Sequence, residues 1–138
     1  ENANMIDTST KGVISVWAGI SKNSINEFNK YTEDMEIPNS GCPAHLDFGV
    51  SFIDSDFFVA YRTNNGAIVS IEDLFLEIGT NSKKTDAQII KKAKEIGIFE
   101  GNSIYYYQNA TFHEKTPGGL YNSLRFLGSF SDPKKNFR

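Results

Sequence analysis

The apolar positions of the chain follow two periods, which predict its strands and its helices. Short runs rich in β-branched and aromatic residues predict strands at residues 13–18, 50–53 and 57–62. Two later runs, residues 103–112 and 120–130, flank a Thr-Pro-Gly-Gly turn and predict a C-terminal hairpin. Alternation gives the last strand two different faces. The apolar face consists of Leu120, Leu124, Phe126 and Phe130, and the opposite, mixed face consists of Tyr121, Arg125 and Ser129.

Two helices are predicted before the second strand. Ser24 and Glu27 have the spacing of a capping box, in which each side chain binds the backbone amide of the other residue. The apolar residues that follow at helical spacing extend this helix to about Thr32. Pro43 favours the first position of a second, short helix, and Gly49 favours its end.

Two further helices are predicted in the middle of the chain. Ser70 is a helix cap, and the apolar residues after it fall on one face as far as Ile78, where Gly79 ends the pattern. The fourth helix covers residues 86–96, with isoleucines and an alanine facing inward and three lysines facing outward. Gly97 is suited to its C-terminal cap.

The predicted order of elements is β-α-α-β-β-α-α-β-β. This order predicts a single α+β domain, with a mixed, mostly antiparallel sheet and helices packed against it. A length of 138 residues fits one domain, and a hydrophobic content of 39% argues against intrinsic disorder. The polar ends, residues 1–12 and 131–138, are predicted to be flexible.

The cysteine content and the length of the apolar runs indicate the cellular compartment in which we expect the protein. Cys42 is the single cysteine, so no intramolecular disulfide can form, which fits a reducing compartment. The longest apolar run, residues 57–61, is too short to cross a bilayer, and the first residues show no signal segment. We therefore expect a cytoplasmic protein with no membrane partner.

Charge is distributed unevenly along the chain, whose net charge is −3. Residues 33–77 contain nine acidic side chains and one basic side chain, Arg62, which gives this third a net charge of −8. Phosphate binding needs lysine and arginine, so the segment argues against nucleic acid as a direct ligand and favours a basic protein partner. The acidic residues expected to face this partner are Glu33, Asp34, Glu36, Asp54, Asp56, Glu72 and Glu77.

The histidines provide the main enzymatic alternative. His45 and His113, with a lysine such as Lys115, have the chemistry of a small ribonuclease-like acid–base pair. Their spacing does not bring the imidazoles together, and the acidic segment would repel RNA. Cys42 and His45 lie three residues apart, whereas catalytic cysteine–histidine pairs usually come from different elements. We interpret this pair as a buried thiol beside a capping imidazole, and the chain as a binding protein without catalytic residues.

Two acidic motifs suggest metal chemistry. Asp47-Phe48-Gly49 matches the magnesium motif of protein kinases, but the sequence lacks the glycine-rich phosphate loop and the catalytic-loop aspartate. We interpret it as a helix end with a buried phenylalanine. Asp54-Ser55-Asp56 offers two carboxylates, whereas a hard cation takes about six oxygen ligands. We expect neither a metal ion nor another cofactor.

Tyr105-Tyr106-Tyr107 suggests a second candidate surface. Adjacent strand residues face opposite sides, so at most two of these rings can share a face for stacking on bases. If the C-terminal hairpin has an open edge, it would accept a partner strand instead. We favour the acidic segment as the partner surface, because its concentrated charge has an obvious use against a basic partner.

Several segments, in order, resemble the bacterial immunity protein 22 family. The most specific are Val16-Trp17-Ala18-Gly19, which closes the first strand, and Asp47-Phe48-Gly49 followed by Asp54-x-Asp56-Phe57. The resemblance covers about residues 13–112, and the remaining matching segments are Phe28 to Tyr31, Ile71-Glu72-Asp73-Leu74-Phe75 and Asn102-Ser103-Ile104.

The resemblance implies a function without catalysis. Members of this family are found beside polymorphic and contact-dependent toxins. The chain is then expected to bind the toxin domain that its own cell makes and to protect the cytoplasm. We expect this toxin to be a nuclease with a basic cleft, because nucleases bind phosphates. The non-enzymatic alternative is an adaptor module with a different client.

Overall fold

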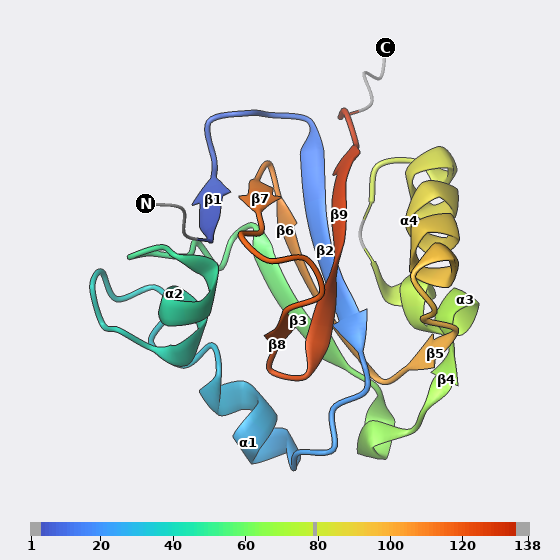
Figure 1. Cartoon of the computed structure of the whole chain (residues 1–138), viewed down its shortest axis with the longest axis horizontal. Helices are drawn as coiled ribbons and strands as arrows, with labels where there is room; N and C mark the ends of the chain where they lie inside the picture. Colours follow the sequence, from blue (N-terminus) through green and yellow to red (C-terminus); the bar gives the residue numbers. More distant parts are fainter. Residues whose placement is uncertain (1–3, 79, 135–138) are drawn as a thin grey trace.

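Five antiparallel strands form the central sheet, in the spatial order β3-β6-β2-β9-β8 (Figure 1). The computed structural model describes residues 4–78 and 80–134. The strands of this sheet are β2 (Val13–Gly19), β3 (Phe58–Arg62), β6 (Ser103–Gln108), β8 (Leu120–Tyr121) and β9 (Leu124–Ser131). Two small antiparallel sheets join β1 (Met5–Asp7) to β7 (Thr111–His113) and β4 (Val69–Ser70) to β5 (Glu100–Gly101). The predicted α+β class is confirmed.

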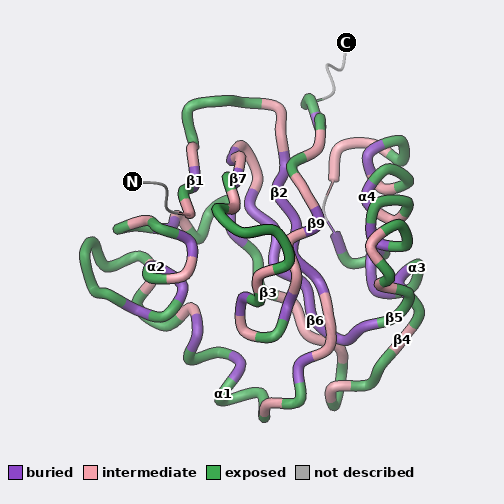
Figure 2. The backbone as a smooth tube through the Cα atoms, viewed as in Figure 1, coloured by how far each residue is buried: buried purple, intermediate pink, exposed green. Residues whose placement is uncertain are grey.

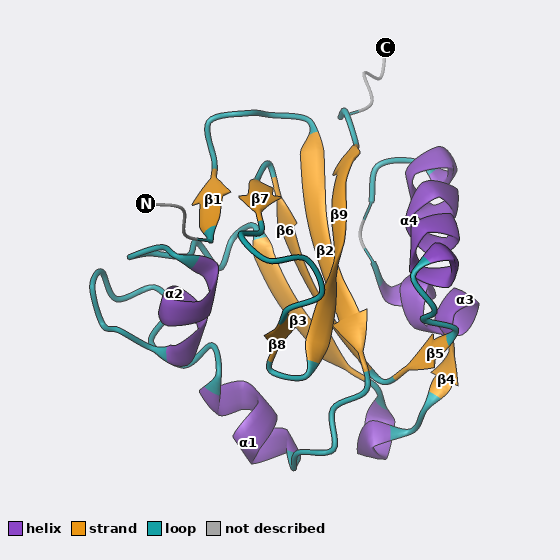
Figure 3. Cartoon of the chain, viewed as in Figure 1, coloured by secondary structure: helices purple, strands orange, loops and turns teal. Residues whose placement is uncertain are grey.

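Helices cover both faces of the central sheet (Figure 3). The helices are α1 (Ile25–Lys30), α2 (Pro43–Phe48), α3 (Ile71–Leu74) and α4 (Lys83–Glu95), and the 3₁₀ turns are η1 (Asn64–Gly66) and η2 (Phe75–Glu77). The Trp17 core is the buried cluster shared with α1 and α2, and the Ile104 core is the cluster shared with α3 and α4. Within the described ranges, no helix is long and apolar enough to cross a membrane.

The central strands β2 and β6 are buried on both sides (Figure 2). Along β2, Val16 belongs to the Ile104 core and its neighbour belongs to the Trp17 core. Along β6, Tyr105 and Tyr106 divide between the two cores in the same way. Because two helical layers cover the sheet, these strands read as continuous apolar runs.

Aromatic rings fill the Trp17 core. The Trp17 ring centroid lies 4.8 Å from that of Phe48, 5.3 Å from that of Phe112 and 5.4 Å from that of Phe126. Such tilted pairs at short range add about 0.5–1.5 kcal/mol each to the hydrophobic gain from burial. The indole therefore connects α2, β7 and β9 to the middle of the sheet.

Local signals at the first two helices are confirmed. The Ser24 hydroxyl accepts a hydrogen bond from the Glu27 amide, and the Glu27 carboxylate accepts one from the Ser24 amide. Pro43 begins α2, and Gly49 follows it in the left-handed region at φ 70°. A Cβ atom at Gly49 would lie 1.7 Å from the backbone oxygen of Asn4, so this position also needs glycine for the close approach.

The next two helices differ from their predicted bounds. The Ser70 hydroxyl caps α3 as expected, but the α-helix ends at Leu74 and tightens into η2. The predicted stop at Gly79 lies outside the described residues. Helix α4 begins at Lys83, ahead of the predicted start at residue 86, because the Ser82 hydroxyl accepts a hydrogen bond from the amide three residues later.

The predicted strand at residues 50–53 is wrong. The Ile53 amide donates to the Met35 carbonyl at 2.9 Å, and the Asn39 amide donates to the Ser51 carbonyl at 2.8 Å. This segment therefore pairs with the preceding loop, and Ile53 is apolar because it is buried in the Trp17 core.

The predicted C-terminal hairpin is also wrong. β6 and β9 both pair with β2, which lies between them. β9 forms its own hairpin with β8 instead. Leu120, predicted on the apolar face, is 64% exposed.

A shift in register explains the faces of β9. The pairing with β2 shifts between Val16 and Trp17, which leaves Leu127 as an extra residue. As a result Phe126 packs against the Trp17 core, whereas Phe130 packs against the Ile104 core. The prediction placed both phenylalanines on one face because strict alternation cannot show a bulge.

Parts of the two terminal segments, residues 1–12 and 131–138, form hydrogen bonds with the rest of the domain. Strand β1 pairs with β7, and its central residue Ile6 is buried. Near the other end, the buried Asp132 carboxylate accepts a hydrogen bond from the Asn81 amide at 2.8 Å. The outermost residues of both segments lie outside the described residues.

Candidate partner-binding surface

Two loops on the Trp17 side of the sheet carry five of the predicted acidic residues, and hydrogen bonds join these loops at Met35 and Glu36. The Met35 carbonyl accepts the Ile53 amide, and the Glu36 carboxylate accepts a hydrogen bond from the Ser55 amide at 3.2 Å. These bonds hold the two acidic segments side by side. The acidic surface, as we call this group, consists of Glu33, Asp34, Glu36, Asp54 and Asp56.

The carboxylates of this surface face solvent. Asp54 is half-buried, and the other four residues are exposed. The Asp54 carboxylate accepts a hydrogen bond from the Asp56 amide at 2.9 Å, which shapes the turn before β3. Hydrogen bonds from Ser55, chiefly from its side chain, lower the pKa of the Glu36 carboxyl below its usual value. Glu36 is therefore fully charged at neutral pH.

The two remaining predicted residues lie in the opposite helical layer. Glu72 belongs to α3, and Glu77 belongs to η2, both of which cover the Ile104 core. Glu72 forms an ion pair with Lys94 of α4, and this lysine lowers the pKa of the Glu72 carboxyl. The sequence prediction treated all seven acids as one surface, but the fold separates these two from the other five.

A hollow of about 260 Å³ borders the acidic surface at the start of β3. Its lining includes Asp54 and the rings of Phe52, Phe57 and Tyr107. Phe52 is 45% exposed and Phe57 is 38% exposed, although both are large apolar side chains. We call this feature the aromatic hollow. It places apolar contact area directly beside carboxylates.

Sequence reasoning missed these two phenylalanines. The available signal was their position on either side of the Asp54-Ser55-Asp56 turn. Their exposure depends on the loop path of residues 50–53, which was predicted as a strand.

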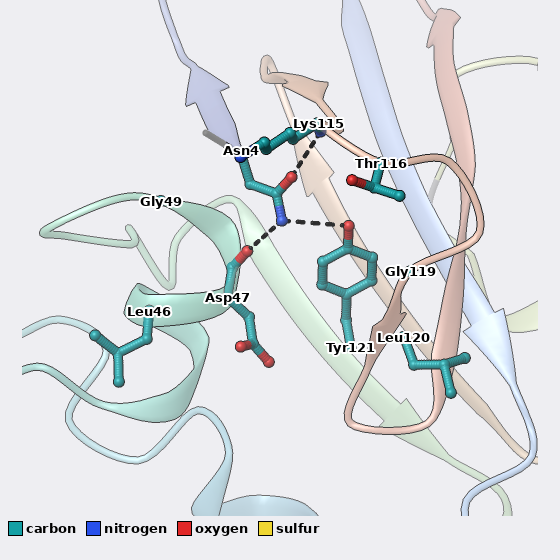
Figure 4. Close-up of a pocket in the computed structure, with 9 residues that line it drawn as sticks. All are labelled: Asn4, Leu46, Asp47, Gly49, Lys115, Thr116, Gly119, Leu120 and Tyr121. Carbon is teal, nitrogen blue, oxygen red and sulfur yellow. Dashed lines mark hydrogen bonds between the residues drawn. The ribbon is translucent and has the colours of Figure 1, made fainter. Parts of the chain in front are cut away.

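A second hollow of about 380 Å³ lies between α2 and β8 (Figure 4). Here the Asn4 amide group donates to the Asp47 carbonyl at 2.9 Å and to the Tyr121 hydroxyl at 3.4 Å. The Tyr121 hydroxyl donates to the Glu114 carboxylate, and the Asp47 carboxylate accepts the Tyr31 hydroxyl at 2.6 Å. These polar groups form hydrogen bonds with one another. Those of Asn4 attach the N-terminal segment to α2 and β8.

The three tyrosines of β6 do not form an exposed surface. Tyr105, Tyr106 and Tyr107 are 0%, 7% and 3% exposed. β6 lies between β3 and β2, so it has no open edge for a partner strand. The alternative binding surface at these tyrosines is therefore wrong, because both faces and both edges of this strand are covered.

The two histidines occupy different environments. His45 is buried in α2, where its Nε2 donates to the Met35 carbonyl at 2.7 Å and its Nδ1 lies 3.4 Å from the Ser40 hydroxyl. His113 is exposed on β7, next to the β1 strand. Both nitrogens of His45 thus have local partners, and this imidazole holds the loop that carries the acidic surface.

The remaining motif residues are part of the helix α2. Cys42 is the buried N-cap residue, and Phe48 is fully buried in the Trp17 core at the helix end, as interpreted from the sequence. Across residues 4–78 and 80–134, no three histidine, cysteine, aspartate or glutamate side chains are grouped so as to hold a metal ion.

Comparison with known proteins gives one finding on family. No curated protein and no solved structure matches this chain. The model of the family described as Immunity protein 22 matches residues 14–131. This range includes the five strands of the central sheet, except for Val13, the first residue of β2. The match extends through β9, beyond the segments whose resemblance was evident from the sequence. The chain therefore belongs to the Immunity protein 22 family.

Proposed function

We propose that this chain binds one cognate bacterial toxin domain and neutralises it by covering the toxin's active site, without catalysing a reaction itself. The observation that carries the proposal is the acidic surface, which lies directly beside the aromatic hollow. Family membership supplies the class of partner, and this surface supplies a place and a chemistry for it.

The charge of the surface favours a basic partner. Nucleases have basic clefts because they bind phosphates, so we propose a nuclease toxin, met in the bacterial cytoplasm. Carboxylates placed where phosphates would lie speed encounter, and association rate constants reach about 10⁸–10⁹ M⁻¹s⁻¹ at low salt in such pairs. The toxin, not this chain, would then be the protein that contacts nucleic acid.

The aromatic hollow gives the same surface an apolar centre. Interface residues that dominate binding are often aromatic rings surrounded by polar groups that exclude water. Phe52 and Phe57 fit this description, because both are partly exposed and lie next to Asp54. We expect Phe52→Ala or Phe57→Ala to weaken toxin binding by about 2 kcal/mol.

The proposal is tested by charge reversal on each helical layer. One variant combines Glu33→Lys with Asp56→Lys, both exposed residues of the acidic surface. The matched control combines Glu77→Lys with Glu95→Lys, which are exposed on the opposite layer and change the net charge equally. The probe is the inactivated C-terminal domain of the protein whose gene lies directly upstream, which we propose to be the toxin. Stopped-flow fluorescence measures its association across a salt series.

The acidic-surface variant is expected to associate about tenfold more slowly at low salt, because it has lost charges that attract a basic partner. Its association is also expected to depend less on salt, because salt acts by screening exposed charges beyond about 8 Å at physiological ionic strength. The control is expected to associate at nearly the wild-type rate. Equal slowing in both variants, or association that is indifferent to salt, would contradict the proposed surface. In a pull-down from the source cell, capture of a basic protein that is not a toxin would support the adaptor alternative instead.

A further inference from the structure

Some backbone groups along the outer edge of β3 have no hydrogen-bond partner among residues 4–78 and 80–134. β3 is the end strand of the central sheet and pairs with β6. Just beyond its two ends, the Gln108 amide donates to the Phe57 carbonyl and the Thr63 amide donates to the Asn102 carbonyl, both at 2.9 Å. Bonded and non-bonded positions alternate along an antiparallel pair. These two bonds therefore fix which residues of β3 face β6.

Alternation assigns the backbones of Val59 and Tyr61 to the ladder with β6. The backbones of Phe58, Ala60 and Arg62 then point away from the sheet. The Phe58 amide already donates to a carbonyl in the preceding turn. In the described part of the chain, no hydrogen bond reaches the amides of Ala60 and Arg62. The outer edge thus offers these two donors and the carbonyl between them.

This edge has few of the features that usually block edge strands, and its one charged residue is Arg62 at the end of the strand. Such strands are commonly protected by proline, by lysine, by a bulge or by a covering segment. The sequence of β3, Phe-Val-Ala-Tyr-Arg, has no proline or lysine, and its pairing with β6 is regular. Val59 is 36% exposed and Ala60 is exposed, so the middle of the strand is open to solvent. The opposite end strand, β8, has only two residues.

We propose that an extended segment of the toxin adds to this edge as a further antiparallel or parallel strand, hydrogen-bonded to the backbones of Ala60 and Arg62. The inference rests on the proposed function, because its occupant is the toxin. The segment is expected to be basic, since Asp54 and Asp56 directly precede β3 and Phe57 joins the strand to the aromatic hollow. Backbone pairing along β3 and charge pairing at its start then form one continuous interface.

Residue-resolved hydrogen exchange tests the strand addition with an internal control. The isotopically labelled chain is measured by NMR, alone and saturated with the same inactivated C-terminal domain that tests the proposed function. The amides of Val59 and Tyr61 are expected to exchange slowly in both states, because they already donate to β6. The amides of Ala60 and Arg62 are expected to exchange rapidly in the free chain and at least about tenfold more slowly in the complex.

A pair of variants at Ala60 gives a second readout. Ala60→Pro removes the outward amide and leaves the β6 ladder intact, as edge strands tolerate. Ala60→Val keeps the amide and suits a strand. The proline variant is expected to raise the Kd for the toxin domain at least about tenfold, whereas the valine variant binds like the wild type. If the proline variant fails to fold, the exchange experiment decides alone.

The outcomes separate this inference from the proposed function. Toxin binding without protection of Ala60 would overturn the strand addition and leave the proposed function intact. Absence of toxin binding would overturn both. Protection of Ala60 that appears in the free chain and grows with its concentration would show that a second copy occupies the edge, which also overturns the inference.

Discussion

Alkaline pH is expected to destabilise this protein through its buried tyrosines. Tyr31 and Tyr105 are 7% and 0% exposed, and their rings stack with centroids 5.6 Å apart. Burial raises the pKa of both hydroxyls above their ordinary value. The Asp47 carboxylate raises the pKa of Tyr31 further, because it accepts a hydrogen bond from the protonated hydroxyl.

The direction and size of the effect follow from these shifts. The folded chain keeps both protons at a pH at which the unfolded chain releases them. Their contribution to stability is therefore complete below about pH 10, the ordinary tyrosine pKa, and falls as the pH rises above it. Each such tyrosine lowers the free energy of unfolding by about 1.4 kcal/mol per pH unit, and the two together lower it by about 2.8 kcal/mol per pH unit.

Urea unfolding at a series of pH values between about 9 and 11.5 measures this slope. Tyr31→Phe and Tyr105→Phe are each expected to reduce it by about 1.4 kcal/mol per pH unit, since a phenylalanine has no proton to release. Tyrosinate absorbance near 295 nm should show that these two hydroxyls ionise when the chain unfolds. Ionisation of either group in the folded chain at about pH 11, or an unchanged slope in both variants, would refute the reasoning.

Two substitutions test the packing of α2. Phe48→Ala is expected to lower the free energy of unfolding by about 3–5 kcal/mol, because the ring is fully buried and its centroid lies 4.8 Å from that of Trp17. Urea denaturation measures this loss, and a loss below about 1 kcal/mol would contradict the packing. Gly49→Ala is expected to cost more than the about 1–2 kcal/mol of left-handed strain, since its Cβ would overlap the Asn4 backbone. Gly97→Ala is the control, because Gly97 also has a positive φ, 88°, but no atom lies within 4 Å of an added Cβ. Equal losses of stability for the two variants in thermal unfolding would argue against the Asn4 contact.

The helix boundaries that could be predicted from the sequence depend on chemistry within a few residues. The capping box of Ser24 and Glu27 needs only those two side chains and their own backbone amides. Pro43 and Gly49 act through their own backbone angles. Such signals are complete within one helical turn, so tertiary context does not change them.

Strand pairing could not be predicted because it depends on distant segments. β6 and β9 looked like neighbours, since a turn separates them, but each bonds to β2. Ile53 looked like part of a strand because it is apolar, whereas its burial comes from loop packing. Apolar pattern reports burial, and burial alone does not identify the partner.

The candidate surface could be predicted in its charge but not in its shape. The excess of acids over bases in residues 33–77 was countable, and hydrogen bonds join the two loops that carry five of the acids. Glu72 was included with them because nothing in the sequence shows that the sheet separates α3 from the acidic loops. Likewise, composition cannot distinguish the exposed Phe52 from the buried Tyr106.

The central position of β2 has a consequence for folding. Trp17 lies opposite Tyr105 on one side and Phe126 on the other, so β2 has neighbours that come much later along the chain. Pairings so distant in sequence close slowly, because the intervening chain must first lose its freedom. β2 therefore cannot gain either of its neighbours in the central sheet until β6 has been made. Refolding experiments should show one late, concerted step in which β2 gains both neighbours, and the loops that carry the acidic surface should become ordered only then.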